Sequence, residues 1–250
     1  QVTSLGKRIK GKTILEDISF EINKGDCVAL IGPNGAGKTV LMSCILGDKK
    51  PSSGQVLIDG KAGKAKNKIA VLLQENTIPN SLKVEELIAF FQSISDNPLT
   101  NQEVQELLQF KEDQYQQFAD KLSGGQRRLL AFVLCLIDKP KILFLDEPTA
   151  GMDTSTRQRF WEIVNDLKKA GTTILYSSHY IEEVEHTADR ILVLHQGKLI
   201  RDTTPYAMRH EEKEKQVTLP SSFVSIVHGL PDIYEITEKR DVISFMTKDI

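Results

Sequence analysis

A glycine-rich loop between a predicted strand and a predicted helix constrains the fold of this chain more than any other feature. Residues 32–39 read Gly-Pro-Asn-Gly-Ala-Gly-Lys-Thr, after the apolar run 28–31 and before the apolar segment 40–46. Glycines let the backbone approach a phosphate, and a helix N-terminus adds the positive end of its dipole. Lys38 is expected to reach the β- and γ-phosphates of a nucleotide, and the Thr39 hydroxyl to ligate Mg²⁺. The strand before and the helix after favour this reading over a chance glycine turn.

Two acidic residues follow a second buried-strand pattern. The apolar run 142–145, Ile-Leu-Phe-Leu, ends in Asp146 and Glu147. A carboxylate at a buried strand end is costly unless it is paired or metal-bound, so Asp146 is expected to hold Mg²⁺ through water. Glu147 is expected to polarise an attacking water as general base. The alternative is an ordinary pair of charges that starts a turn before Pro148.

A second glycine motif lies between these two features. Residues 122–126 read Leu-Ser-Gly-Gly-Gln, and Ser123 lies 84 residues after Thr39. A serine hydroxyl and glycine N–H groups at the start of a helix near Gln126 would form a second phosphate clamp. The same residues also make a simple helix cap after a glycine turn, and the two readings are compatible.

With these motifs in this order, the chain resembles the nucleotide-binding subunits of ABC transporters over roughly residues 1–210. The resemblance implies a P-loop NTPase fold of the ABC type. This is an α/β fold with a mainly parallel core sheet, an antiparallel β-subdomain, an inserted helical subdomain and a small C-terminal α+β appendage. It also implies a dimer that closes head to tail, in which Ser123–Gln126 of each subunit cap the γ-phosphate bound by the other. The 84-residue gap leaves no room for the long coiled coils of DNA-repair relatives.

The resemblance assigns four further residues. Gln74, after the strand pattern 69–73, matches the glutamine that senses Mg²⁺ and the attacking water, and His179 matches the switch histidine that contacts the γ-phosphate. Asp153 matches the loop through which one site senses the other. Ile9 stands where the family usually stacks adenine on an aromatic ring, a contact worth roughly 1–3 kcal/mol, so we predict weaker and less base-selective nucleotide binding. The expected site residues are, for catalysis, Glu147, His179 and Gln74; for nucleotide binding, Ile9, Gly32, Pro33, Asn34, Gly35, Ala36, Gly37, Lys38, Thr39, Ser123, Gly124, Gly125, Gln126 and Asp153; and for Mg²⁺, Thr39, Gln74 and Asp146.

Changes in periodicity along the chain suggest its organisation. The β pattern disappears from about residue 80 to 138, where helical spacing predicts a subdomain inserted into an ATPase domain of residues 1–210. Strand patterns then return with helices between them, as in a mainly parallel sheet. Residues 206–216 have the composition of a charged connector. A strand, helix, strand, strand pattern predicts a small appendage at 211–250, compatible either with binding a regulator or with extending the dimer interface.

Composition restricts the partners and the location. The net charge is −2 with both signs interspersed, so nucleic acid is not expected as a partner. Cys27, Cys44 and Cys135 have apolar neighbours and are typical of reduced core residues of a cytosolic protein. The longest apolar run, 129–137, has nine residues, whereas a membrane span needs about 20. Any transport pathway is therefore expected in another polypeptide. The chain itself is expected in the cytoplasm, peripheral on the inner face of the cell membrane.

The expected function is ATP hydrolysis, with ATP and Mg²⁺ as cofactors, by a dimer that powers transport through separate transmembrane permease subunits. Whether the dimer is a homodimer or a heterodimer stays open. The separate ATPase chain with its short appendage resembles bacterial drug or antibiotic exporters more than importers. The rival is a soluble ABC ATPase that acts as an assembly scaffold, as in iron–sulfur cluster biogenesis, because such proteins share every motif above. A nucleotide switch without hydrolysis is disfavoured by the presence of Glu147.

Overall fold

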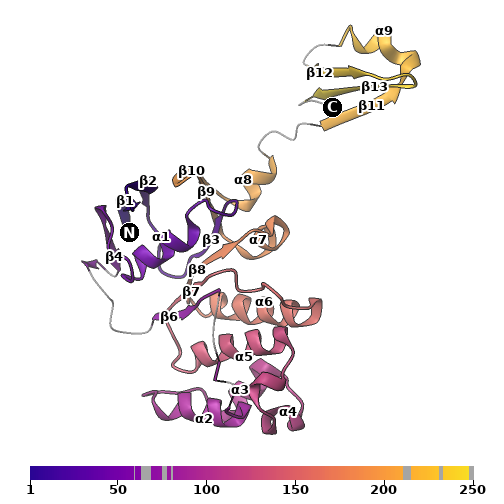
Figure 1. The fold of residues 1–250 in the computed structure, drawn as a ribbon. Helices are drawn as coiled ribbons and strands as arrows, with labels where there is room; N and C mark the ends of the chain where they lie inside the picture. Colours follow the sequence, from indigo (N-terminus) through magenta and orange to yellow (C-terminus); the bar gives the residue numbers. More distant parts are fainter. Residues whose placement is uncertain are drawn as a thin grey trace. The chain divides into compact units, whose positions relative to one another are not determined.

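The computed structural model describes residues 1–58, 60–62, 69–74, 78–79, 81–210, 215–230 and 233–247 (Figure 1). The predicted connector and the predicted appendage fall partly outside this range, at residues 211–214, 231–232 and 248–250. The chain forms two compact units, Gln1–Pro205 and Tyr206–Ile250. The division between residues 210 and 211 stays a prediction about domains.

A mainly parallel sheet forms the centre of the first unit. Its strand order is β10-β9-β3-β8-β7-β6, and only the pair β10 and β9 is antiparallel among these described strands. Every residue of β3 is buried, as expected for a strand covered on both faces. The strands are β3 (Cys27–Ile31), β6 (Ile69–Leu72), β7 (Ile142–Leu145), β8 (Thr173–Ser178), β9 (Arg190–His195) and β10 (Lys198–Thr203).

An antiparallel sheet packs beside this core, in the order β2-β1-β4-β5. One hydrophobic cluster joins both sheets to helix α1 (Lys38–Ile45), since it contains Leu15, Leu41 and Leu192 from the three parts. The glycine loop therefore leads from a core strand into a helix held by both sheets. The strands are β1 (Val2–Ile9), β2 (Lys12–Phe20), β4 (Ser53–Ile58) and β5 (Lys61–Ala62).

Helices occupy the chain between β6 and β7, and in Figure 1 they gather below these strands. Helix α3 starts with a capping box, in which Thr100 and Glu103 each accept a hydrogen bond from the backbone of the other. Phe132 of α5 packs on Phe160 of α6, with ring centroids 4.4 Å apart. The helices of this insertion are α2 (Val84–Ser93), α3 (Asn101–Leu108), α4 (Glu112–Gln116), the 3₁₀ turn η1 (Ala119–Lys121) and α5 (Gly124–Leu136). Helix α6 (Thr154–Lys169) follows β7, and α7 (Ile181–Thr187) follows β8.

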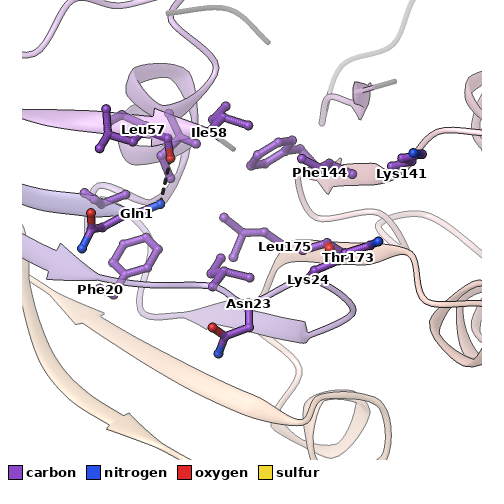
Figure 2. Close-up of a pocket in the computed structure, with 15 residues that line it drawn as sticks. Gln1, Phe20, Asn23, Lys24, Leu57, Ile58, Lys141, Phe144, Thr173 and Leu175 are labelled. Atoms are coloured by element: carbon purple, nitrogen blue, oxygen red, sulfur yellow. Dashed lines mark hydrogen bonds between the residues drawn. The ribbon is translucent and has the colours of Figure 1, made fainter. Parts of the chain in front are cut away.

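A cavity of about 250 Å³ lies between the two sheets (Figure 2). Phe20 of the antiparallel sheet faces it from one side, and Phe144 and Leu175 of the core sheet face it from the other. Lys141 and Thr173, at its rim, stand at the amino ends of β7 and β8. The glycine loop follows the carboxyl end of β3, so this cavity is separate from the phosphate site.

The second unit is a small α+β arrangement. Strands β11, β13 and β12 pair antiparallel in that order, and Val227, Ile243 and Phe245 form its core. Residues 206–210, expected in a connector, instead continue helix α8, which begins at Pro205, a residue favoured in the first helical turn. The elements are α8 (Pro205–His210), β11 (Lys215–Pro220), the 3₁₀ turn η2 (Ser221–Phe223), α9 (Val224–Val227), β12 (Ile233–Glu238) and β13 (Val242–Thr247).

The expected fold class is confirmed: the structure contains the mainly parallel sheet, the antiparallel sheet, the inserted helices and the α+β appendage. No helix among the described residues combines the length and the apolarity that crossing a membrane requires. The three cysteines are free thiols. Burial raises the pKa of Cys27 to about 12 and that of Cys135 to about 11, so both thiols are protonated at neutral pH.

Candidate functional site

The glycine loop has the close backbone packing that its sequence predicts. A Cβ atom on Gly32 would lie 2.1 Å from the carbonyl oxygen of Leu194, and Gly37 has a φ of 107°, which side chains disfavour. Lys38 is 7% exposed, and its Nζ donates to the carbonyl oxygen of Gly32 at 2.7 Å. Its ammonium is thus folded over the loop, where it can meet an anion cradled by the loop.

Asp146 lies at the meeting point of α1, β7 and β8. Its side chain accepts hydrogen bonds from Thr39 Oγ1 at 3.0 Å and from Ser177 Oγ at 2.5 Å, and the residue is only 3% exposed. Two hydroxyl donors make this buried carboxylate tolerable. Sequence reasoning expected Thr39 and Asp146 at one metal site, and the structure places their side chains in contact.

The same pair has the donor chemistry of a magnesium site. Mg²⁺ prefers oxygen ligands and is usually held by one or two carboxylates together with substrate phosphates and water. Among the described residues, no cluster of three His, Cys, Asp or Glu side chains could hold a metal alone. The hydroxyl of Thr39 and the carboxylate of Asp146 therefore fit an ion that enters with a nucleotide.

Glu147 follows in an unusual backbone conformation. Its φ of 44° lies in the left-handed region, and its N–H donates to Ser177 Oγ at 2.9 Å. Strained backbone of this kind is concentrated at functional sites. Because of this turn, the Glu147 carboxylate lies 3.9 Å from Lys38 Nζ, 3.5 Å from Gln74 Nε2 and 3.6 Å from His179 Nδ1.

The structure thus brings the expected catalytic residues Glu147, Gln74 and His179 together beside the phosphate loop. The side chain of Glu147 is 14% exposed, so it is nearly buried yet reachable by a water molecule. Gln74 Nε2 stands at the long end of hydrogen-bond range, and Lys38 Nζ and His179 Nδ1 lie just beyond it, as is common in catalytic sites before substrate binds.

The second glycine motif caps helix α5. Ser123 Oγ accepts from Gln126 N at 3.2 Å, and Gln126 Oε1 accepts from Ser123 N at 3.1 Å. In the described part of the chain, no hydrogen bond of Ser123 or Gln126 reaches the phosphate loop. A Cβ on Gly124 would meet no atom within 4 Å, so the helix end stays open. The clamp assigned to Ser123–Gln126 stays a prediction.

Asp153 lies against the same motif, since a Cβ on Gly125 would come within 3.0 Å of its Oδ2. It caps helix α6 and accepts hydrogen bonds from the backbone and side chains of Ser155 and Thr156. The Ser155 hydroxyl, followed by the Thr156 backbone and side chain, holds the pKa of Asp153 well below its usual range. A structural role as a cap is clear, and its role in sensing a second site stays a prediction.

Ile9 is the last residue of β1, opposite Lys12, and is half-buried. Its proposed contact with a nucleotide base stays a prediction. A titration that compares ATP with GTP tests it, because a strong preference for ATP would contradict reduced base selectivity.

Two residues of the site were missed from the sequence. Ser177, in β8, is completely buried and binds both acidic residues. Arg128, in α5, donates to the carbonyl oxygens of Gln74, Asp146 and Pro148 at 3.1 Å each, and to those of Leu73 and Glu147. Burial lowers the pKa of Arg128, but an arginine still carries its charge at neutral pH. Neither role has a local sequence signal, because each depends on strand ends that meet only in the fold.

Comparisons with known proteins all point to one family. A family model described as ABC transporter matches residues 15–150. The chain is 33% identical over 215 residues to the Nod factor export ATP-binding protein I of Burkholderia lata, covering 82% of this chain and 71% of that protein. It is 35% identical over 211 residues to the linearmycin resistance ATP-binding protein LnrL of Bacillus subtilis, covering 80% and 67%.

Solved structures give the same result for the fold. An ATP-binding subunit of an ABC transporter superposes with a TM-score of 0.73 at 26% identity, covering 84% of this chain and 91% of that one. The ATP-binding cassette MJ0796, a dimer bound to ADP and phosphate, gives a TM-score of 0.71 and covers 82% of this chain and 97% of that one. At 21% identity the second likeness shows the fold alone.

Proposed function

We propose that this chain, which belongs to the ABC transporter family, is the ATP-hydrolysing subunit of an exporter. The membrane-spanning path of that exporter lies in separate permease subunits. The observation that carries this proposal is the grouping of Gln74 and His179 around Glu147, beside Lys38. Such a grouping serves hydrolysis, because a nucleotide held only for binding does not need a nearly buried carboxylate next to its phosphates.

Nucleotide binding is assigned to the loop and its helix. The backbone of residues 32–37 and the ammonium of Lys38 hold the phosphates, with the N-terminus of α1 behind them. Thr39 and Asp146 hold Mg²⁺, which when bound supplies positive charge to the phosphate oxygens. These assignments follow from the oxygen donors in contact at this point.

Hydrolysis is assigned to Glu147. A water molecule attacks the γ-phosphorus, the new P–O bond forms as the bond to the ADP oxygen breaks, and the water proton passes to the Glu147 carboxylate. That proton then leaves with the phosphate product. Gln74 and His179 orient the water and the γ-phosphate, since both side chains already face the carboxylate.

A dimer completes the site. Ser123–Gln126 form the N-terminus of α5, where Gly124 has open space beside it, and the partner subunit's nucleotide is assigned as their ligand. Two chains thus enclose two ATP molecules. Asp153, next to Gly125, is assigned the contact between the two sites.

Export and a peripheral location on the inner face of the membrane are assigned from the relatives. The similar proteins are named for Nod factor export and linearmycin resistance, and neither name describes an assembly scaffold. The scaffold alternative is therefore not favoured. Permease subunits are the corresponding partners.

The experiment is a pull-down of the Glu147→Gln variant from its native membranes in mild detergent with ATP and Mg²⁺. Slow hydrolysis should hold the closed state, and a protein with several membrane spans should co-purify. A matched control adds Lys38→Ala to the same variant, which should lose the nucleotide-dependent partner. If only proteins without membrane spans co-purify, the exporter assignment is wrong, although the ATPase assignment would stand.

A further inference from the structure

His179 contacts Tyr180, and Tyr180 contacts Arg157, two residues to which no role in ATP hydrolysis has been assigned. The rings of His179 and Tyr180 have centroids 4.0 Å apart, with planes tilted by 38°. The guanidinium carbon of Arg157, in α6, lies 5.2 Å from the centroid of the Tyr180 ring. Tyr180 is therefore in contact with the imidazole on one hand and with a cation from another helix on the other.

Glu183 forms an ion pair with that cation. Its carboxylate lies 3.4 Å from Arg157 Nε in an ion pair, and Thr149 Oγ1 donates to its two oxygens at 3.0 and 3.2 Å. The Glu183 side chain is only 10% exposed, so its charge depends on these partners. Thr149 belongs to the turn that follows Glu147, and the cluster is thereby tied to the backbone that carries the general base.

Arg157 has a further anchor on its own side. Its Nη2 donates to the carbonyl oxygen of Met152 at 3.4 Å, in the loop before α6. The guanidinium is thus held by an ion pair and a backbone carbonyl while its face remains against the Tyr180 ring. These two contacts, both at 3.4 Å, place the guanidinium beside the Tyr180 ring.

His179 is such a neighbour. Its side chain is 42% exposed, and it lies 3.6 Å from the Glu147 carboxylate and against the Tyr180 ring. The backbone N–H of Tyr180 donates to Ser178 Oγ at 3.0 Å, which sets the turn after β8. The turn places the imidazole near Glu147, and the ring contact restricts the rotation of its plane.

We propose that Arg157 and Glu183 are positioning residues for hydrolysis, acting through the Tyr180 ring to hold the His179 imidazole against Glu147. The inference rests on the proposed catalytic roles of His179 and Glu147. It adds a second layer that connects α6 and α7 to the reacting groups, and it assigns no contact with ATP to Arg157, Glu183 or Tyr180.

The test uses the ring of Tyr180 in the full chain, with ATP and Mg²⁺. Tyr180→Leu removes the ring and with it the cation–π contact and the ring contact with His179. We therefore expect kcat to fall about tenfold, with little change in KM. Tyr180→Phe retains the ring and should keep kcat close to that of the unaltered protein. Arg157→Met should lower kcat in the same way, and Arg157→Lys, which keeps a cation, should restore part of it.

A double-mutant cycle separates positioning from general weakening of the fold. In a His179→Ala background, Tyr180→Leu should cause no further loss of kcat, because its effect passes through the imidazole. A loss by the same factor in both backgrounds would overturn the proposal. If Tyr180→Leu does not fold, as judged by thermal unfolding, the same cycle is measured with Arg157→Met.

The outcomes also separate this proposal from the one on which it rests. If His179→Ala is slow but Tyr180→Leu and Arg157→Met are not, only the positioning role is wrong. If His179→Ala keeps the kcat of the unaltered protein, the catalytic assignment of His179 is wrong and the positioning role falls with it.

Discussion

The substitution Ser177→Ala should disturb the metal carboxylate and the general base at once. The Ser177 hydroxyl donates to Asp146 Oδ1 at 2.5 Å and accepts the N–H of Glu147 at 2.9 Å, and no part of the residue is exposed. The substitution leaves a buried N–H without a partner and takes one donor from a buried carboxylate. It also frees Glu147 from one of the bonds that hold its φ of 44°.

The magnitude follows from these two bonds. An orphaned buried N–H costs about 1–3 kcal/mol, and a hydrogen bond to a charged group contributes about 1.5–3 kcal/mol. Allowing for local relaxation, the free energy of unfolding should fall by about 2–5 kcal/mol. If about half of that loss appears as misplacement of Glu147, kcat should fall by about 5- to 70-fold, since 1.36 kcal/mol corresponds to a factor of ten.

The assay pairs denaturant unfolding with steady-state ATP hydrolysis. The matched control is Ser244→Ala in the second unit, where a half-buried hydroxyl makes one neutral hydrogen bond with Thr218 at 3.0 Å. This control should lose about 1 kcal/mol or less and keep its kcat. A Ser177→Ala protein as stable and as active as the Ser244→Ala control would show that the Ser177 hydroxyl does not hold Asp146 and Glu147 in place.

Three further predictions concern other parts of the site. Gly197→Ala should weaken both folding and ATP binding more than Gly171→Ala does, because both positions have positive φ, but only at Gly197 would the Cβ meet an atom, the Ile14 carbonyl oxygen at 2.2 Å. The Gly197 N–H also donates to the phosphate loop, so unfolding and ATP titration should change together. Arg128→Met should lower the single-turnover rate by about tenfold or more while ATP binding changes little, since it removes the donors to the carbonyls around Glu147. Asp153→Ala should destabilise the fold at neutral pH. Because the pKa of Asp153 is lowered in the folded state, its carboxylate stabilises the fold above about pH 4, and this contribution is lost as the pH falls through the folded-state pKa. The difference in unfolding midpoint between the unaltered protein and the Asp153→Ala variant should therefore shrink in acid.

Local patterns in the sequence were enough to predict most of the core. The apolar runs at β3 and β7, and the glycine loop between β3 and α1, can be recognised from residues that are adjacent in the sequence. Strand β1 was not predicted. Its pairing with β2 contains register shifts between Val2 and Arg8, and such bulges break the alternation of buried and exposed residues by which a strand is recognised.

The site divides in the same way. Some site residues belong to motifs whose chemistry can be predicted from neighbouring residues, namely Lys38, Thr39, Asp146 and Glu147. Ser177 does not, because its buried hydroxyl in an apolar strand gains a function only where β8 runs beside β7. The contacts of Arg128 and Arg157 likewise join segments that are distant in sequence, and they are visible only after the chain has folded.

The most direct test of the central claim is single-turnover hydrolysis of ATP with Mg²⁺ by the Glu147→Gln variant, measured beside the unaltered protein with nucleotide binding followed on the same samples. The variant keeps the shape of the side chain but removes its ability to take a proton. We expect the Kd for ATP of the variant to lie within a few-fold of that of the unaltered protein, a difference in binding free energy of about 0.6 kcal/mol or less. We expect its rate of ATP cleavage to be lower by a factor of about 10² or more. Cleavage at the unaltered rate would show that Glu147 is not the general base and would contradict the account of the site.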